Sequence, residues 1–183
     1  MDQKFASTQN FPTPTMLESI EYMDADDELG LIFNHLKQNT GHLGDIDRGR
    51  IKFLYGNKPK KDGGRYIIGY LMARGILEKT VVPQYDYIVV VYYPIWKDLD
   101  NESKSLHLDK ILCGIHVEQD KNGNEIAKKM PTDSREYYDN MRYWGADKVL
   151  KQSEAMHLAI TSKIEDIKSK NKEKKKNEQG KSV

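Results

Sequence analysis

The sequence predicts a single α+β domain, with a small mixed or antiparallel sheet, a central helix packed on it, and further helices at the N- and C-terminal ends. A chain of 183 residues has the length of one domain and can bury a sizeable core. Helical periodicity marks three segments, and strand-like segments lie between the first and the second. We expect a flexible lead over residues 1–16, the domain over 17–167 and a disordered basic tail over 168–183.

The first helix is expected over residues 17–38. Its apolar residues recur at helical spacing, and Thr40-Gly41 supplies a stop signal. Acidic side chains gather in its first half, where the positive end of the helix dipole favours them. The apolar positions are Leu17, Ile20, Leu29, Ile32, Phe33 and Leu36.

Three strands are expected to follow. Residues 50–56 alternate apolar and polar side chains, residues 57–64 contain the Asn, Pro, Asp and Gly residues typical of a turn, and residues 66–73 would return as the second strand of a basic hairpin. Apart from Asp86, residues 85–93 are β-branched or aromatic, which indicates a strand buried on both faces.

Two helical regions complete the domain. Leu108, Ile111, Leu112 and Ile115 form one apolar stripe within residues 101–118, so this helix should lie against the sheet. A turn at residues 121–124 precedes a second helical region that begins near Pro131-Thr132-Asp133 and continues towards residue 164. Beyond Lys168 the chain has no aromatic residue and too little apolar surface to order itself.

The composition argues against a secreted or membrane protein. A single cysteine, Cys113, excludes an intramolecular disulfide, and the longest apolar run, residues 87–93, is far shorter than the roughly 20 residues of a membrane span. Residues 1–15 lack the apolar region of a signal peptide. We therefore expect a protein of the reducing cytoplasm.

Charge is segregated although the net charge is only +1. The first helical segment is acidic, with no Lys or Arg between Lys4 and Lys37, whereas residues 48–65 hold seven basic residues and one acid. Such separation produces a bipolar surface field that favours charged partners. The acidic binding candidates are Glu21, Asp24, Asp26 and Asp27, and the basic ones are Arg48, Arg50, Lys52, Lys58, Lys60, Lys61 and Arg65.

Short segments between residues 50 and 145 carry a resemblance to a known family. They are Arg50-Ile51-Lys52, Gly69-Tyr70, Tyr87-Ile88-Val89, Trp96 and the helical run Leu108-Asp109-Lys110-Ile111-Leu112-Cys113-Gly114. In this order they resemble the metallopeptidases carried by bacteriophages, relatives of the small SprT-like zincins. The resemblance implies a zincin-like helix packed on the sheet, and a phage or prophage origin with action in the cytoplasm of the bacterial host.

The zinc motif of that family is replaced here. The family helix carries His-Glu-Leu-Cys-His, where two histidines four residues apart bind zinc and the glutamate activates a metal-bound water. The resemblance places Lys110, Ile111 and Gly114 at the His, Glu and His positions, and Thr132 at the third zinc ligand. Because none of these side chains can replace a ligand or the base, the resemblance implies a pseudoenzyme without cofactor.

A displaced metal site is the alternative to this interpretation. Asp109, Cys113 and His116 would share one face of a helix over residues 101–118, and all three residue types bind metals. Buried Cys and marginal Asp and His are also common structural residues, and this second interpretation is favoured.

The basic segment 48–65 is a candidate contact for RNA or DNA. It interleaves cations with Phe53 and Tyr55, a combination that neutralises phosphates and stacks on unpaired bases. A solvated hairpin with its aromatic residues turned inward explains the same pattern.

We therefore expect an accessory protein that binds and inhibits a host protein or nucleoprotein complex, in the manner of an anti-CRISPR inhibitor of Cas9 with its guide RNA. Its acidic segment could mimic nucleic acid, and its basic segment could contact RNA. Two alternatives stay open. One is an enzyme, either a hydrolase with a displaced metal site or a metal-independent ribonuclease; the other is a regulatory homodimer built through the aromatic second helix.

Overall fold

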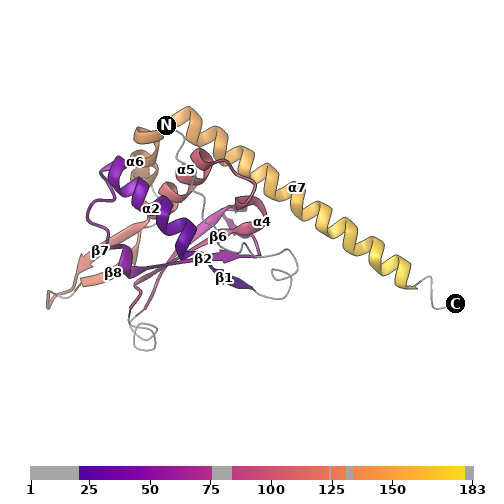
Figure 1. The fold of residues 1–183 in the computed structure, drawn as a ribbon, viewed down its shortest axis with the longest axis horizontal. Coiled ribbons are helices and arrows are strands. Elements are labelled where there is room, and N and C mark those ends of the chain that lie inside the picture. Colours follow the sequence, from indigo (N-terminus) through magenta and orange to yellow (C-terminus); the bar gives the residue numbers. More distant parts are fainter. Residues whose placement is uncertain (1–20, 76–83, 124, 131–133, 180–183) are drawn as a thin grey trace.

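The computed structural model describes residues 21–75, 84–123, 125–130 and 134–179. Their architecture is α+β, as the sequence predicts, with one four-stranded sheet and two small two-stranded sheets. Helices gather on one side of the strands, and the last helix extends well beyond the body of the domain (Figure 1).

The four-stranded sheet has the order β1-β2-β6-β5. Its two central strands, β2 and β6, run parallel with Phe53 opposite Val89, while β1 and β5 pair antiparallel at the edges. The strands are β1 (Tyr22–Asp24), β2 (Ile51–Gly56), β5 (Gly69–Ala73) and β6 (Tyr87–Tyr92).

Two hairpins lie outside this sheet. Strand β3 (Lys60–Asp62) pairs with β4 (Arg65–Ile67), and β7 (Ile115–Gln119) pairs with β8 (Glu125–Lys129). Both pairs are antiparallel, and each turns through a glycine with positive φ, a conformation that costs other residues free energy.

The helices contribute the other layer. Helix α2 packs on β2 and α5, and α5 packs on β5 and α6. The helical elements are α2 (Asp26–Thr40), the short 3-10 turn η1 (Arg48–Arg50), α4 (Tyr93–Trp96), α5 (Asn101–Leu112), α6 (Ser134–Trp144) and α7 (Ala146–Gln179). No helix among the described residues is long and apolar enough to cross a membrane.

The core lies between the helices and the sheet. Phe33 of α2 meets Phe53 of β2 with ring centroids 6.3 Å apart, and Trp96 and Leu108 are fully buried. Each such side chain contributes about 1.5–3 kcal/mol through burial. On β2, Ile51, Phe53 and Tyr55 face this core, so the alternation predicted from the sequence is confirmed.

The first helix begins later than expected. Residues 22–24 form an edge strand against β2, and α2 starts at Asp26. Pairing with β2 satisfies the backbone hydrogen-bonding groups of these residues, which a helical turn would otherwise satisfy. Residues 17–20 lie outside the described residues.

The expected hairpin between residues 50–56 and 66–73 is wrong. Strand β2 is flanked by β1 and β6, and β5 pairs with β6 instead. A parallel β2–β6 pair requires a long connection, and the basic turn residues within it form the separate β3–β4 hairpin.

The helix expected over residues 101–118 ends at Leu112, and residues 115–119 form β7. The second helical region divides into α6 and α7 at Gly145, whose φ of 89° ends the first helix. Helix α7 continues to Gln179, so the tail expected to be disordered from residue 168 is helical up to there; its Lys and Glu residues are good helix formers.

Candidate functional site

The three motif positions on and just after α5 line one cavity. Lys110, Ile111 and Gly114 open onto a space of about 480 Å³ enclosed by α5, β4, β5 and α7. Apolar side chains, including Leu71 and Met156, make part of its lining. The polar part consists of Asp62, Arg65, Tyr66, Tyr70, His107, Lys129, Ser153 and His157. These residues form a cleft beside α5, which we call the α5 cleft.

Lys110 brings a basic side chain to this cleft. Its Nζ donates a hydrogen bond to Ser153 Oγ of α7 at 3.2 Å. Burial lowers the pKa of Lys110 because the charged form is poorly solvated there, while Asp62 acts in the opposite direction.

Ile111 and Gly114 stand at the other two motif positions that the resemblance assigns to this segment. The Ile111 side chain lies against Gly69 of β5, in an apolar contact. Gly114 lies beyond the end of α5, since the helix ends at Leu112. Thr132, which the resemblance places at the third ligand position, lies outside the described residues.

His107 occupies the wall of the same cleft, one helical turn before Lys110. Its side chain is only 3% exposed, and burial together with the nearby Lys110 charge lowers its pKa to about 4. The imidazole is therefore neutral at physiological pH. Its Nε2 makes no hydrogen bond within the described part of the chain. This buried polar atom offers a hydrogen-bonding group to a ligand in the cleft.

A second group of chemically active side chains lies around Asp109. Asp109 Oδ1 is 2.8 Å from His42 Nε2, and Cys113 Sγ is 3.5 Å from the same nitrogen. Asp109 is fully buried, and its hydrogen bond to His42 raises the pKa of the imidazole against the effect of burial. The predicted trio is thus divided: Asp109 and Cys113 meet His42, a residue that sequence reasoning missed.

His116 does not join this group through its contacts. It lies on β7 rather than on α5, and its Nε2 is 3.5 Å from Glu118. It does line, with His42, Cys113 and Asp139, a small cavity of about 180 Å³. No local pattern could have indicated His42, because it is 67 residues from Asp109 in the sequence.

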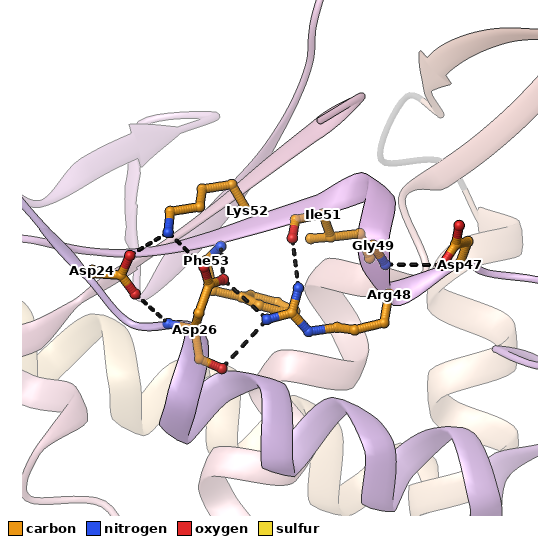
Figure 2. Close-up of polar contacts among 8 residues, drawn as sticks. All are labelled: Asp24, Asp26, Asp47, Arg48, Gly49, Ile51, Lys52 and Phe53. Carbon is orange, nitrogen blue, oxygen red and sulfur yellow. Dashed lines mark hydrogen bonds and ion pairs between the residues drawn. The ribbon is translucent and has the colours of Figure 1, made fainter. Parts of the chain in front are cut away.

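The acidic and basic segments largely neutralise one another. Asp26 accepts hydrogen bonds from Arg48 and from the Phe53 N–H, both at 3.0 Å, and Lys52 bridges Asp24 and Asp26 (Figure 2). Burial works to raise the pKa of Asp26, but the contacts with Lys52 and Phe53 hold it below its usual range. These residues connect β1, α2 and β2.

Other predicted binding residues are also paired. Lys58 forms an ion pair with Glu21 at 3.1 Å, and Arg50 bonds Asp86 and Glu125. Tyr55 is buried and donates its hydroxyl to Glu28, which contradicts a role in stacking on bases. The expected bipolar surface is therefore weaker than the sequence suggests.

Three basic residues of the β3–β4 hairpin remain without an ion pair in the described structure, namely Lys60, Lys61 and Arg65. Lys60 lies 4.1 Å from the ring centre of Tyr70, and Lys61 lies 4.6 Å from that of Tyr66. Because Arg65, Tyr66 and Tyr70 line the α5 cleft, the hairpin extends the cleft's positive charge.

A comparison with family models assigns the chain to a class of metallopeptidase-like scaffolds. Residues 20–176 match the family described as "Putative phage metallopeptidase". The chain belongs to this family, which makes it a phage-type protein. Comparisons with curated proteins and with solved structures found no match.

Proposed function

We propose that this chain is a degenerate, non-hydrolytic member of the family, which binds a partner through the α5 cleft. The observation that carries the proposal is that Lys110, which the resemblance places at the position of a zinc ligand, lines the α5 cleft. A protonated lysine has no lone pair for a metal, and isoleucine cannot accept a proton from water. The family mechanism therefore has neither its ligand nor its base.

The chemistry of the cleft favours an anionic partner. Arg65, Lys110 and Lys129 contribute cations to it, against the one acid Asp62. Lys60 and Lys61 on the adjoining hairpin add two exposed charges beside the rings of Tyr70 and Tyr66. Clustered cations neutralise phosphates, and neighbouring rings stack on unpaired bases.

A host defence nucleoprotein in the bacterial cytoplasm is the partner that we propose, specifically a Cas9-type effector with its guide RNA. The chain would act as an anti-CRISPR-like inhibitor. The phage family supports the setting, and the basic hairpin beside the cleft supports contact with RNA. Nucleic-acid mimicry by the acidic segment has less support, because Asp24 and Asp26 are engaged by Lys52 and Arg48.

The test measures binding of the full chain to a guide RNA–Cas9 complex, to the guide RNA alone and to Cas9 alone, at several salt concentrations. Lys60→Glu/Lys61→Glu should weaken binding to the complex at least about tenfold and reduce the slope of log affinity against log salt by about 2. The chain should inhibit DNA cleavage by the complex, and this inhibition should be relieved in the variant in parallel with its weaker binding.

Lys168→Glu/Lys170→Glu is the matched control, because it reverses two exposed lysines on α7 that lie beyond His157, the last residue of the chain that lines the cleft. It should retain affinity and inhibition. Absence of binding to all three preparations, or equal weakening by both double variants, would refute a specific role for the hairpin.

A further inference from the structure

Three different ligand atoms converge on the side of α5 that bears Asp109 and Cys113. His42 Nε2, Asp109 Oδ1 and Cys113 Sγ all lie within 4.8 Å of one another. They come from the loop after α2 and from α5 and its end. Imidazole nitrogen, carboxylate oxygen and thiolate sulfur are the donor atoms that zinc sites use.

The spacing on α5 repeats that of the family's two histidines, shifted by one residue. Asp109 and Cys113 are four residues apart, as are Lys110 and Gly114, the two family ligand positions. A shift of one residue turns the pair by about 100° around the helix. Accordingly, Lys110 and Gly114 line the α5 cleft, whereas Cys113 and His42 line the smaller cavity of about 180 Å³.

Two of the three separations among the ligand atoms suit a tetrahedral ion after a small adjustment, and the third, between Asp109 and Cys113, lies within 4.8 Å. Zinc–ligand bonds of about 2.0–2.3 Å place neighbouring ligand atoms about 3.3–3.6 Å apart. His42 Nε2 and Cys113 Sγ already stand at 3.5 Å, and the 2.8 Å contact between His42 Nε2 and Asp109 Oδ1 would open by about half an ångström. His42 is half-buried beside the small cavity, which leaves a route for the ion and space for a fourth ligand.

The hydrogen bonds around Asp109 leave one of its carboxylate oxygens available to act as a metal ligand. Asp109 Oδ2 accepts hydrogen bonds from Asn140 Nδ2 and Trp144 Nε1 of α6, both at 2.9 Å. These donors fix the carboxylate and leave Oδ1 directed at His42. Such outer hydrogen bonds orient the ligating groups in metal sites.

A divalent cation could replace the proton at His42 Nε2. This N–H can donate to Asp109 Oδ1 and also approach Cys113 Sγ, which is a weak acceptor. One cation in place of that proton would contact the oxygen, the nitrogen and the sulfur together.

We propose that His42, Asp109 and Cys113 bind one divalent cation of the zinc class, at a site separate from the α5 cleft. The ion would fasten the loop after α2 to the end of α5 and, through Asp109, to α6. This site is additional to the binding function proposed for the α5 cleft. Loss of the ion is expected to leave the positions of Lys60 and Lys61 unchanged.

The test uses the full chain after metal removal, titrated with Zn²⁺ against a chromophoric chelator and separately with Co²⁺. The expected result is one Zn²⁺ per chain, a rise in melting temperature on binding, and a near-ultraviolet thiolate-to-Co²⁺ absorption band. Cys113→Ser should abolish the band, and both Cys113→Ser and His42→Gln should weaken Zn²⁺ binding at least about tenfold. His35→Gln, an exposed histidine of α2, is the control and should bind as the parent does.

Absence of Zn²⁺ binding at tens of micromolar, a Co²⁺ spectrum without the thiolate band, or equal binding by Cys113→Ser and the parent would each overturn the proposal. The parent protein's Co²⁺ spectrum decides the question even where a variant fails to fold. Binding of the chain to the guide RNA–Cas9 complex, measured with and without Zn²⁺, separates this proposal from that for the cleft. Only the cleft proposal predicts that this binding is lost in Lys60→Glu/Lys61→Glu.

Discussion

Ile111 and Gly69 fit against each other so closely that the backbone of β5 has no room for a side chain. A Cβ added to Gly69 would lie 2.6 Å from Ile111 Cδ1 and 2.7 Å from the carbonyl oxygen of Val90. The packing of Ile111 at the α5 cleft therefore depends on a glycine on the neighbouring strand.

Gly69→Ala is accordingly expected to destabilise the protein by about 1–3 kcal/mol, because overpacking forces the backbone or Ile111 to move. The free energy of urea-induced unfolding measures this. Gly75→Ala is the control, since a Cβ there meets no atom within 4 Å, and it should change stability little. Ile111→Val combined with Gly69→Ala should recover part of the loss, and a Gly69→Ala protein as stable as the parent would contradict the close contact.

Local patterns in the sequence were sufficient to predict the elements that form the core. The β-branched run 87–92 forms the central strand β6, and the apolar stripe with Leu108 and Leu112 places α5 on the sheet. Both signals arise from side-chain period and burial, which are local properties.

Pairings between distant segments could not be predicted in the same way. The parallel partner of β2 lies more than thirty residues away, and nothing within residues 50–73 distinguishes it from a hairpin partner. The early end of α5 was missed because Ile115 continues the helical stripe, although it begins strand β7 instead. His42 reaches Asp109 only through the packing of α2 on α5.

Asp26 is expected to contribute more to stability than its acidic neighbour Asp27. It accepts hydrogen bonds from Arg48, Lys52 and the Phe53 N–H, whereas Asp27 is exposed. Asp26→Ala removes the acceptor of the Phe53 N–H and one of the acceptors of Arg48 and of Lys52, and should cost roughly 2 kcal/mol or more. Thermal and urea unfolding measure the effect, with Asp27→Ala as the control expected to stay within about 0.5 kcal/mol of the parent. Equal effects of the two variants would refute the structural role of Asp26.

The end of α7 is expected to add little to the stability of the domain. Residues 169–173 are exposed, whereas Ile160 is fully buried. A chain ending at Lys168 should therefore melt within about 2 °C of the full chain. A chain ending at Ala159 loses Ile160 and should melt much lower. If removal of residues 169–183 by itself lowered the melting temperature strongly, these residues would make contacts that the exposed side chains of residues 169–173 do not indicate.

His107 is expected to make the protein sensitive to mild acid. Its pKa in the folded chain is about 4, below the 6.5 of an ordinary histidine, so the unfolded chain binds more protons between these values. The contribution of neutral His107 to the free energy of unfolding is fully present above about pH 6.5. It is lost as pH falls towards 4, by roughly 3 kcal/mol in total. The free energy of unfolding should therefore fall more steeply from pH 7 to 4.5 for the parent than for His107→Gln. His116→Gln, which changes a half-exposed histidine, is the control and should follow the parent. Parallel pH profiles for the parent and His107→Gln would show that His107 takes up its proton in the folded chain as readily as in the unfolded one.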